Sequence, residues 1–266
     1  MRHSILAFCI AFLAGPAWAH EFWISPERYR VEPGGTMQAD IRVGENFKGG
    51  GYPFIPANFK RFDLVQGNSV VPVTATIGDR PALAMAAPSS GLWVVVHQTK
   101  DYALTYGNWP KFERFTADKD MAWAQDEHVA RRLPKEGFRE RYSRYGKSLI
   151  AVGDGAGADR AVGLLTEIVA LANPYTDAVS GGMPFLVLYE GAPRANVQVE
   201  VFERRADGSV AERKYRTDAA GRVTVPVAPG AEYLVNSVVI RAIEARSDSQ
   251  PVWETYWASL TFAVPQ

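Results

Sequence analysis

Short segments in which every second residue is apolar recur along this chain, and turn residues separate them. Between Thr36 and Val43 the apolar side chains stand at alternate positions, directly after a Pro-Gly-Gly turn. Val197, Val199 and Val201 repeat the pattern later in the chain. Because successive side chains of a strand point to opposite faces, a period of two gives each segment one apolar face. The chain is therefore predicted to be mainly β.

Further strand candidates occur at 62–65, 70–77, 92–96 and 233–240, with Gly, Pro, Asn and Ser between them. Several short strands at such spacing favour a sandwich. We expect two β-sandwich domains, Ig-like or prealbumin-like, joined by a helical insertion. The expected boundaries are 20–117 for the N-terminal β domain, 118–175 for the helical connecting region and 176–266 for the C-terminal Ig-like β-sandwich.

The connecting region is predicted to hold two helices, at 119–133 and 135–150, because apolar residues there follow helical spacing among many charges. Pro134 separates the two, and a Gly-rich segment at 153–157 ends the second. One face of the second helix is expected to be core, and carries Tyr142, Tyr145 and Leu149. Its basic residues are expected to form a solvated face, with an anion site as the alternative. They are Arg139, Arg141, Arg144 and Lys147.

Charge balance and missing motifs exclude several classes of function. Lys and Arg total 29 and Asp and Glu total 29, so the formal net charge is zero. A nucleic-acid-binding protein normally carries a basic excess, and so does a polybasic membrane-surface protein. The sequence contains no G-x-S-x-G elbow, P-loop, H-E-x-x-H or EF-hand pattern. We therefore predict no catalytic residues and no enzyme activity.

The first 19 residues are predicted to be a cleavable signal peptide. Arg2 and His3 precede an apolar run, and Ala17-Trp18-Ala19 fits the small-x-small rule for cleavage. The run is too short to span a bilayer in the mature protein. Cys9, the one cysteine of the chain, lies in this leader, so disulfides and thiolate metal sites are excluded from the mature form. We expect a periplasmic protein without a membrane span.

Cleavage after Ala19 makes His20 the first residue, and this position has chemical consequences. A free α-amino group has a pKa of about 7.7–8.0 and an imidazole about 6.5. Both lose their protons near neutral pH, so the amine nitrogen and ring Nδ1 can chelate one metal ion. A second imidazole completes a three-nitrogen site, for which His97 is the first candidate and His128 the weaker one. Such donors suit nickel or copper, with cobalt or zinc as further options.

Several segments of the mature chain resemble the DUF4198 family of exported bacterial proteins, often labelled as nickel-uptake or NikM-like periplasmic components. His20-Glu21-Phe22-Trp23-Ile24 looks like the family's start, and Tyr142, Arg144 and Lys147 resemble its Tyr-x-Arg-x-x-Lys segment. The resemblance implies metal-linked transport and His20 as a ligand. Other resembling segments are 173–177, 188–193, 217–221, 233–237 and 252–262.

These observations together predict a periplasmic metal-binding accessory protein. Its partners would be the metal ion and an inner-membrane uptake transporter. One alternative is a metal-independent module that binds a carbohydrate or peptide on aromatic side chains. Another alternative is a copper enzyme that uses the same three-nitrogen site, known as a histidine brace. Tryptophan candidates for the carbohydrate or peptide groove are Trp93, Trp109, Trp123, Trp253 and Trp257.

Overall fold

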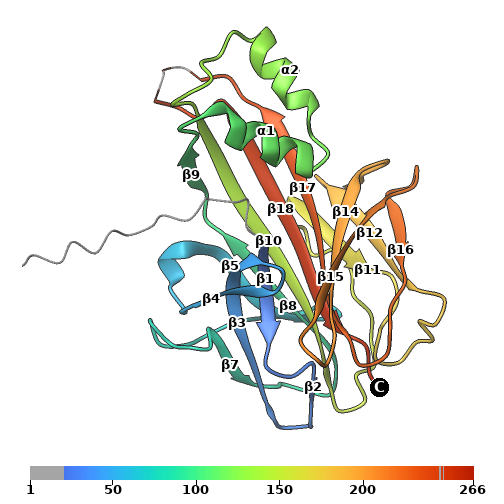
Figure 1. The fold of residues 1–266 in the computed structure, drawn as a ribbon. Helices are drawn as coiled ribbons and strands as arrows, with labels where there is room; N and C mark the ends of the chain where they lie inside the picture. The colour runs from blue at the N-terminus through green and yellow to red at the C-terminus, as the bar shows by residue number, and fades with distance from the viewer. Residues whose placement is uncertain (1–20, 246, 248) are drawn as a thin grey trace, which may run out of the picture.

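The computed structural model describes residues 21–245, 247 and 249–266, and the expected signal peptide and His20 lie outside this part of the chain. The described chain forms three sheets and two α-helices (Figure 1). The fold is mainly β with a helical insertion, which confirms the predicted class. No helix within the described residues has both the length and the apolar character needed to cross a membrane.

The largest sheet has ten strands and runs through the middle of the molecule. Its main path is β15 (Val210–Arg216), β14 (Gln198–Arg204), β17 (Glu232–Ala242), β18 (Trp253–Ala263), β10 (Arg139–Val152), β8 (Gly91–Thr99), β5 (Phe59–Gln66) and β6 (Ser69–Pro72). Two short strands, β2 (Arg30–Val31) and β9 (Tyr102–Thr105), also pair with β10. β10 and β18 run parallel at the centre. This sheet therefore takes strands from both sides of the expected connecting region.

Two four-stranded sheets flank the central one. The first contains β1 (Glu21–Pro26), β3 (Thr36–Glu45), β4 (Lys48–Tyr52) and β7 (Leu83–Ala86), all antiparallel. The second contains β11 (Thr166–Ala170), β12 (Met183–Tyr189), β13 (Ala192–Pro193) and β16 (Arg222–Val225). A 3-10 turn, η1 (Pro56–Asn58), precedes β5.

The flanking sheets pack against opposite faces of the central sheet. On β8, Trp93 and Val95 belong to the core shared with β1 and β3, whereas Leu92 and Val94 belong to the core shared with β11 and β12. Strands at the centre are therefore buried on both sides. This explains why β10 shows buried residues at consecutive positions from 145 to 152.

The segment 135–150 was predicted to be a helix, and this prediction is wrong, because residues 139–152 form β10. A central strand buried on both faces loses the alternation by which a strand is recognised in sequence. The predicted helix 119–133 is confirmed only over α2 (Trp123–Ala130). The other helix, α1 (Trp109–Asp118), lies earlier than expected and is capped by Asn108, whose side chain accepts from the Lys111 N–H at 3.2 Å.

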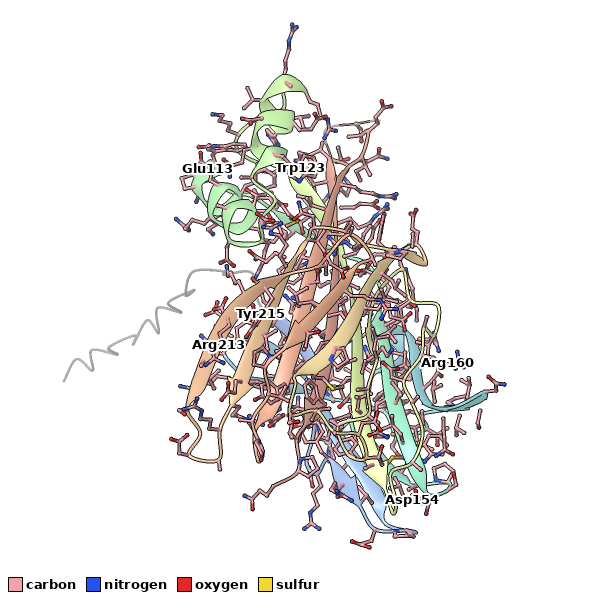
Figure 2. The ribbon with its side chains drawn as sticks, turned by 90° about the vertical axis from the view of Figure 1, so that its right-hand side faces the viewer. Glu113, Trp123, Asp154, Arg160, Arg213 and Tyr215 are labelled. Carbon is pink, nitrogen blue, oxygen red and sulfur yellow. The ribbon has the colours of Figure 1, made fainter. Side chains whose placement is uncertain are left out.

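The helices cover one end of the central sheet. Phe112 and Phe115 of α1 pack with Trp253 and Trp257 of β18 in a separate aromatic core. Figure 2 shows Glu113 and Trp123 at this end of the molecule, and Asp154 at the opposite end. α1 thereby comes to stand beside the start of β1, where a cavity is found.

Candidate functional site

A cavity of about 820 Å³ lies where β1 begins, between α1, β4 and the central sheet. Its volume is in the range of small-molecule sites. Aromatic side chains form much of its wall: Tyr52, Tyr106, Phe115, Tyr142, Phe202 and Trp257. Charges of both signs also line it, namely Glu21, Glu45, Asp118, Glu140 and Glu212 with Lys111, Arg114, Lys119 and Arg144.

The position of β1 depends on a glycine in β10. Phe22 lies directly on Gly146, where an added Cβ would stand 2.8 Å from the Phe22 ring. Because Gly146 has no side chain, β1 can cross the central sheet closely at this point. Glu21, the first described residue, consequently reaches the cavity wall.

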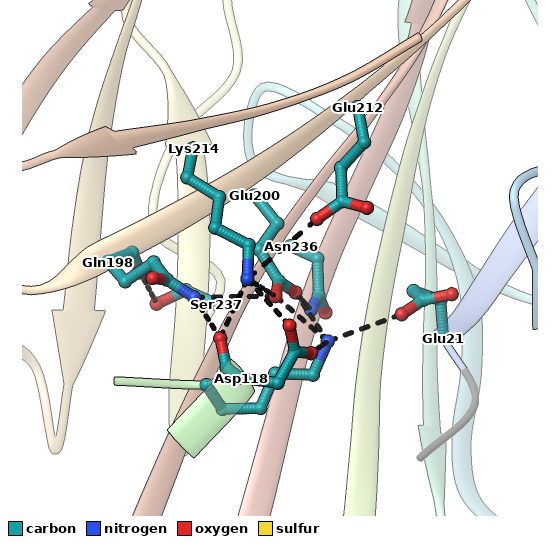
Figure 3. A network of polar contacts seen from close by, with 9 residues as sticks. Glu21, Asp118, Gln198, Glu200, Glu212, Lys214, Asn236 and Ser237 are labelled. Atoms are coloured by element: carbon teal, nitrogen blue, oxygen red, sulfur yellow. Dashed lines mark hydrogen bonds and ion pairs between the residues drawn. The ribbon is translucent and has the colours of Figure 1, made fainter. Parts of the chain in front are cut away.

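Lys119, at the C-terminal end of α1, is buried at the centre of a polar network whose outer members, Asp118 and Lys214, are exposed (Figure 3). Its Nζ lies 2.8 Å from Glu200 Oε1, 3.1 Å from Asp118 Oδ2 and 3.4 Å from Glu21 Oε1. Lys214 reaches Asp118 at 2.6 Å. Burial alone would lower the pKa of Lys119, but Glu200 and Glu21 raise it above its ordinary value. Lys119 is therefore held as a cation.

Negative charge is in excess around this network. Four carboxyl groups (Glu21, Asp118, Glu200 and Glu212) face the two ammonium groups of Lys119 and Lys214, so acidic groups outnumber basic ones there. Glu21 has the longest contact to Lys119 of the three carboxylates around it. Burial raises the pKa of Glu21 to about 7, although Lys119 acts in the opposite direction. The region next to the expected mature terminus thus favours an added cation.

Glu140 is a second buried carboxylate in the cavity wall. The Tyr106 hydroxyl donates to its Oε2 at 2.6 Å, and the Thr255 hydroxyl donates to its Oε1. Burial raises the pKa of Glu140 to about 7, while these two hydrogen bonds lower it. Both carboxyl oxygens are thus already occupied by donors within the protein.

His97 lies in an aromatic cage next to β1. Its ring is 5.4 Å from that of Phe22, 5.4 Å from Phe59 and 5.0 Å from Phe62, measured between centroids. The residue is 2 % exposed, and neither ring nitrogen has a hydrogen-bond partner among the described residues. Burial lowers the pKa of His97 to about 3. Its imidazole is therefore neutral and buried, and its nitrogens have no hydrogen-bond partner among the described residues.

His128, by contrast, is committed to the fold. Its Nδ1 accepts from the Trp253 indole N–H at 3.0 Å, so its Nε2 carries the proton and donates to the Pro134 carbonyl at 3.0 Å. It packs on Trp109, Phe112 and Phe138, and shares no ring neighbour with His97. The two histidines thus belong to different parts of the structure.

Within residues 21–245, 247 and 249–266, no three His, Asp or Glu side chains gather in a group that would hold a metal ion. His20 lies outside that part of the chain. Several buried polar atoms without a hydrogen-bond partner do gather near the start of β1: besides the His97 nitrogens, they are Asn236 Oδ1, Ser259 Oγ and Arg144 Nε. Ser259 pairs with both Gly146 and Asn236 in the central sheet. Because Phe22 lies on Gly146, the row formed by these three residues lies beneath Phe22.

Comparison with protein families gives one match over most of the chain. The model described as "Domain of unknown function (DUF4198)" matches residues 17–241. The chain belongs to the DUF4198 family. No curated protein matched it. Among solved structures it is similar to a tetra-tandem repeat in the extending region of a large adhesion protein, at 11 % identity and a TM-score of 0.20. That alignment covers 92 % of this chain and 49 % of the other.

For this DUF4198 protein, sequence reasoning missed Glu21, Lys119 and Glu140. Arg144 was expected on a solvated face, but its Nε is buried and the residue lines the cavity. Of the tryptophan candidates, Trp257 lines the cavity, whereas Trp93 and Trp253 are buried in cores. Two sequence signals pointed to this region: the Tyr-x-Arg-x-x-Lys resemblance, which singled out Tyr142 and Arg144, and the anion site given as the alternative for the basic residues that include Arg144.

Proposed function

We propose that this DUF4198 protein is a periplasmic accessory protein that binds a divalent transition metal ion, nickel or copper, as cargo for an inner-membrane uptake system. The amine and imidazole of His20, freed by cleavage after Ala19, would chelate the ion, and His97 would supply the second imidazole. The observation that carries the proposal is the uncommitted ring of His97, 5.4 Å from the ring of Phe22, two residues after His20.

The donor set fits this class of ion. One amine and two imidazoles are nitrogen ligands of the kind that copper, nickel and zinc prefer. A buried polar group without a partner costs free energy, so an imidazole that contacts a ligand is better satisfied than one enclosed only by phenylalanine rings. His128 lacks this capacity because both of its nitrogens are hydrogen-bonded.

Electrostatics support the same position. In the network around Lys119 acidic groups outnumber basic ones, and Glu21 directly follows His20. A divalent cation near this terminus would offset that excess. Cargo binding needs no covalent chemistry, because the chain's residues only have to lose protons, hold the ion and release it.

Metal binding is expected to depend on the free amine. We would compare the correctly processed chain with one carrying a single added glycine before His20, using calorimetry with nickel and with copper. Blocking the chelate is expected to weaken binding by about tenfold or more, since loss of even an indirect supporting group costs about 10–100-fold. Binding should also weaken below about pH 6.5, where the imidazole and the amine of His20 are protonated.

His97→Phe is the matched variant for the second imidazole, because phenylalanine suits the aromatic cage. It should lose metal affinity while it keeps its thermal stability at neutral pH. Equal affinity in the processed and extended chains would remove the chelate from consideration. Equal affinity in the processed chain and His97→Phe would remove only His97.

A second candidate function is metal-independent binding of a small organic molecule in the cavity. The specific observation in its favour is the wall that Tyr52, Tyr142 and Trp257 provide beside charged groups of both signs. Such a mixture of apolar surface and a few polar groups is typical of ligand sites.

A further inference from the structure

Arg144 stands out among the charged residues of the cavity wall. Its backbone N–H is held by the Thr99 hydroxyl at 3.0 Å, which fixes this point of β10. Its guanidinium carbon lies 5.0 Å from the centre of the Tyr142 ring. The Nε atom is buried and has no hydrogen-bond partner in the described part of the chain, and the side chain makes no ion pair there. One N–H donor of the guanidinium, at Nε, is thus buried without an acceptor among the described residues.

The groups that face Arg144 do not neutralise it. The carboxylate that acts on it is Glu140, whose two oxygens already accept from Tyr106 and Thr255. The other groups that act on it are the phenols of Tyr52, Tyr102 and Tyr142. Burial lowers the pKa of Arg144 from its ordinary value, yet an arginine remains charged. The cavity wall therefore carries a half-buried cation that forms no ion pair within the described residues.

We propose that the cavity binds a small organic carboxylate, whose carboxylate group pairs with the guanidinium of Arg144. The planar guanidinium matches a carboxylate in a two-bond arrangement. Lys111 and Arg114 of α1 line the same cavity and likewise form no ion pair within the described residues. This site does not depend on the proposed metal chelate, and it rests on the second candidate function, for which it names the class of ligand.

The cavity's other charges define the class of anion. Glu21, Asp118 and Glu212 also line it, so a compact, multiply charged anion such as phosphate would meet several like charges. A singly charged or zwitterionic carboxylate avoids most of that repulsion. Its apolar part can lie against Tyr52, Tyr142 and Trp257, as aromatic walls bury apolar surface well. Aromatic carboxylates and aromatic amino acids are therefore the expected ligands.

The test uses the mature chain, stripped of metal by dialysis, in thermal-shift and calorimetric titrations. The probes are 3-phenylpropionate, benzoate and L-phenylalanine, each compared with its carboxamide, together with inorganic phosphate. The key variant is Arg144→Lys, which keeps the charge but loses the planar fork. Arg141→Lys is its matched control, since Arg141 is in the same strand, pairs with Glu254 and is absent from the cavity wall.

We expect at least one carboxylate to raise the melting temperature of the unmodified chain by several degrees, while its amide and phosphate do not. Arg144→Lys should bind that carboxylate at least tenfold more weakly, and Arg141→Lys should bind it normally. The proposal is overturned when no carboxylate shifts the transition, when amides bind as well, or when Arg144→Lys retains full affinity. If the unmodified chain binds nickel but no carboxylate, only this site is contradicted. If it binds a carboxylate but no nickel, only the metal chelate is contradicted.

Discussion

Replacing His97 with phenylalanine is expected to make the protein much more resistant to acid. In the folded protein burial lowers the pKa of His97 from 6.5 to about 3. Below pH 6.5 the unfolded chain therefore binds a proton at His97 that the folded chain does not bind. The free energy of unfolding consequently decreases as the pH falls toward 3. The shift corresponds to roughly 5 kcal/mol in full, and to about 3 kcal/mol between pH 7 and pH 4.

Urea unfolding of both proteins at pH 7 and at pH 4 measures this effect. Carboxylates elsewhere in the fold also respond to acid, but they are common to the two proteins, so the difference between them isolates His97. At pH 7 the variant should be at least as stable as the unmodified chain, because it removes two buried nitrogens that have no hydrogen-bond partner among the described residues. Parallel loss of stability in the variant and the unmodified chain would mean that the ring is solvated or paired.

Removal of Lys147 is expected to destabilise the fold severely. Its ammonium lies 2.7 Å from Asp159 and 3.0 Å from Glu167, and all three side chains are at most 1 % exposed. Lys147→Met would leave two buried carboxylates without their cation. Breaking a buried pair in this way costs about 3–5 kcal/mol, because an uncompensated charge remains in the core.

Chemical denaturation at neutral pH measures the loss. Lys60→Met is the matched control, since Lys60 pairs with Asp101 at 2.8 Å but both side chains are more than 40 % exposed. That exposed pair should contribute less than about 1 kcal/mol. Adding Asp159→Asn and Glu167→Gln to Lys147→Met should recover part of the stability. A cost similar to that of Lys60→Met would contradict the role assigned to Lys147.

Where apolar residues alternate or run together between turn residues, local sequence was sufficient. The alternation between Thr36 and Val43 corresponds to β3, and the segments at 62–65, 92–96 and 233–240 fall within β5, β8 and β17. Turn residues between these segments were equally informative. Local patterns therefore predicted the mainly β class, with a helical insertion placed near its correct position.

The central strand was beyond local reasoning. In β10 both faces are buried from Tyr145 onward, so the period of two disappears and charged residues at 139–144 make the segment look helical. The incorrectly predicted helix would also place the residues of the site on different faces. On a helix Tyr142, Arg144 and Gly146 point in different directions, but on a strand they share a face. The pairing of β10 with β8 and β18 places this face of β10 next to the start of β1.

By itself, the sequence determined the β class, the membership features of the DUF4198 family and the hypothesis that His20 becomes a terminal chelate. The tertiary structure decided which polar groups lack partners. It encloses His97 among phenylalanine rings, hydrogen-bonds His128 to Trp253 and leaves Arg144 Nε without an acceptor beside a cavity. The physical reason is that burial and pairing arise between strands distant in the chain, whereas residue order records only local preference.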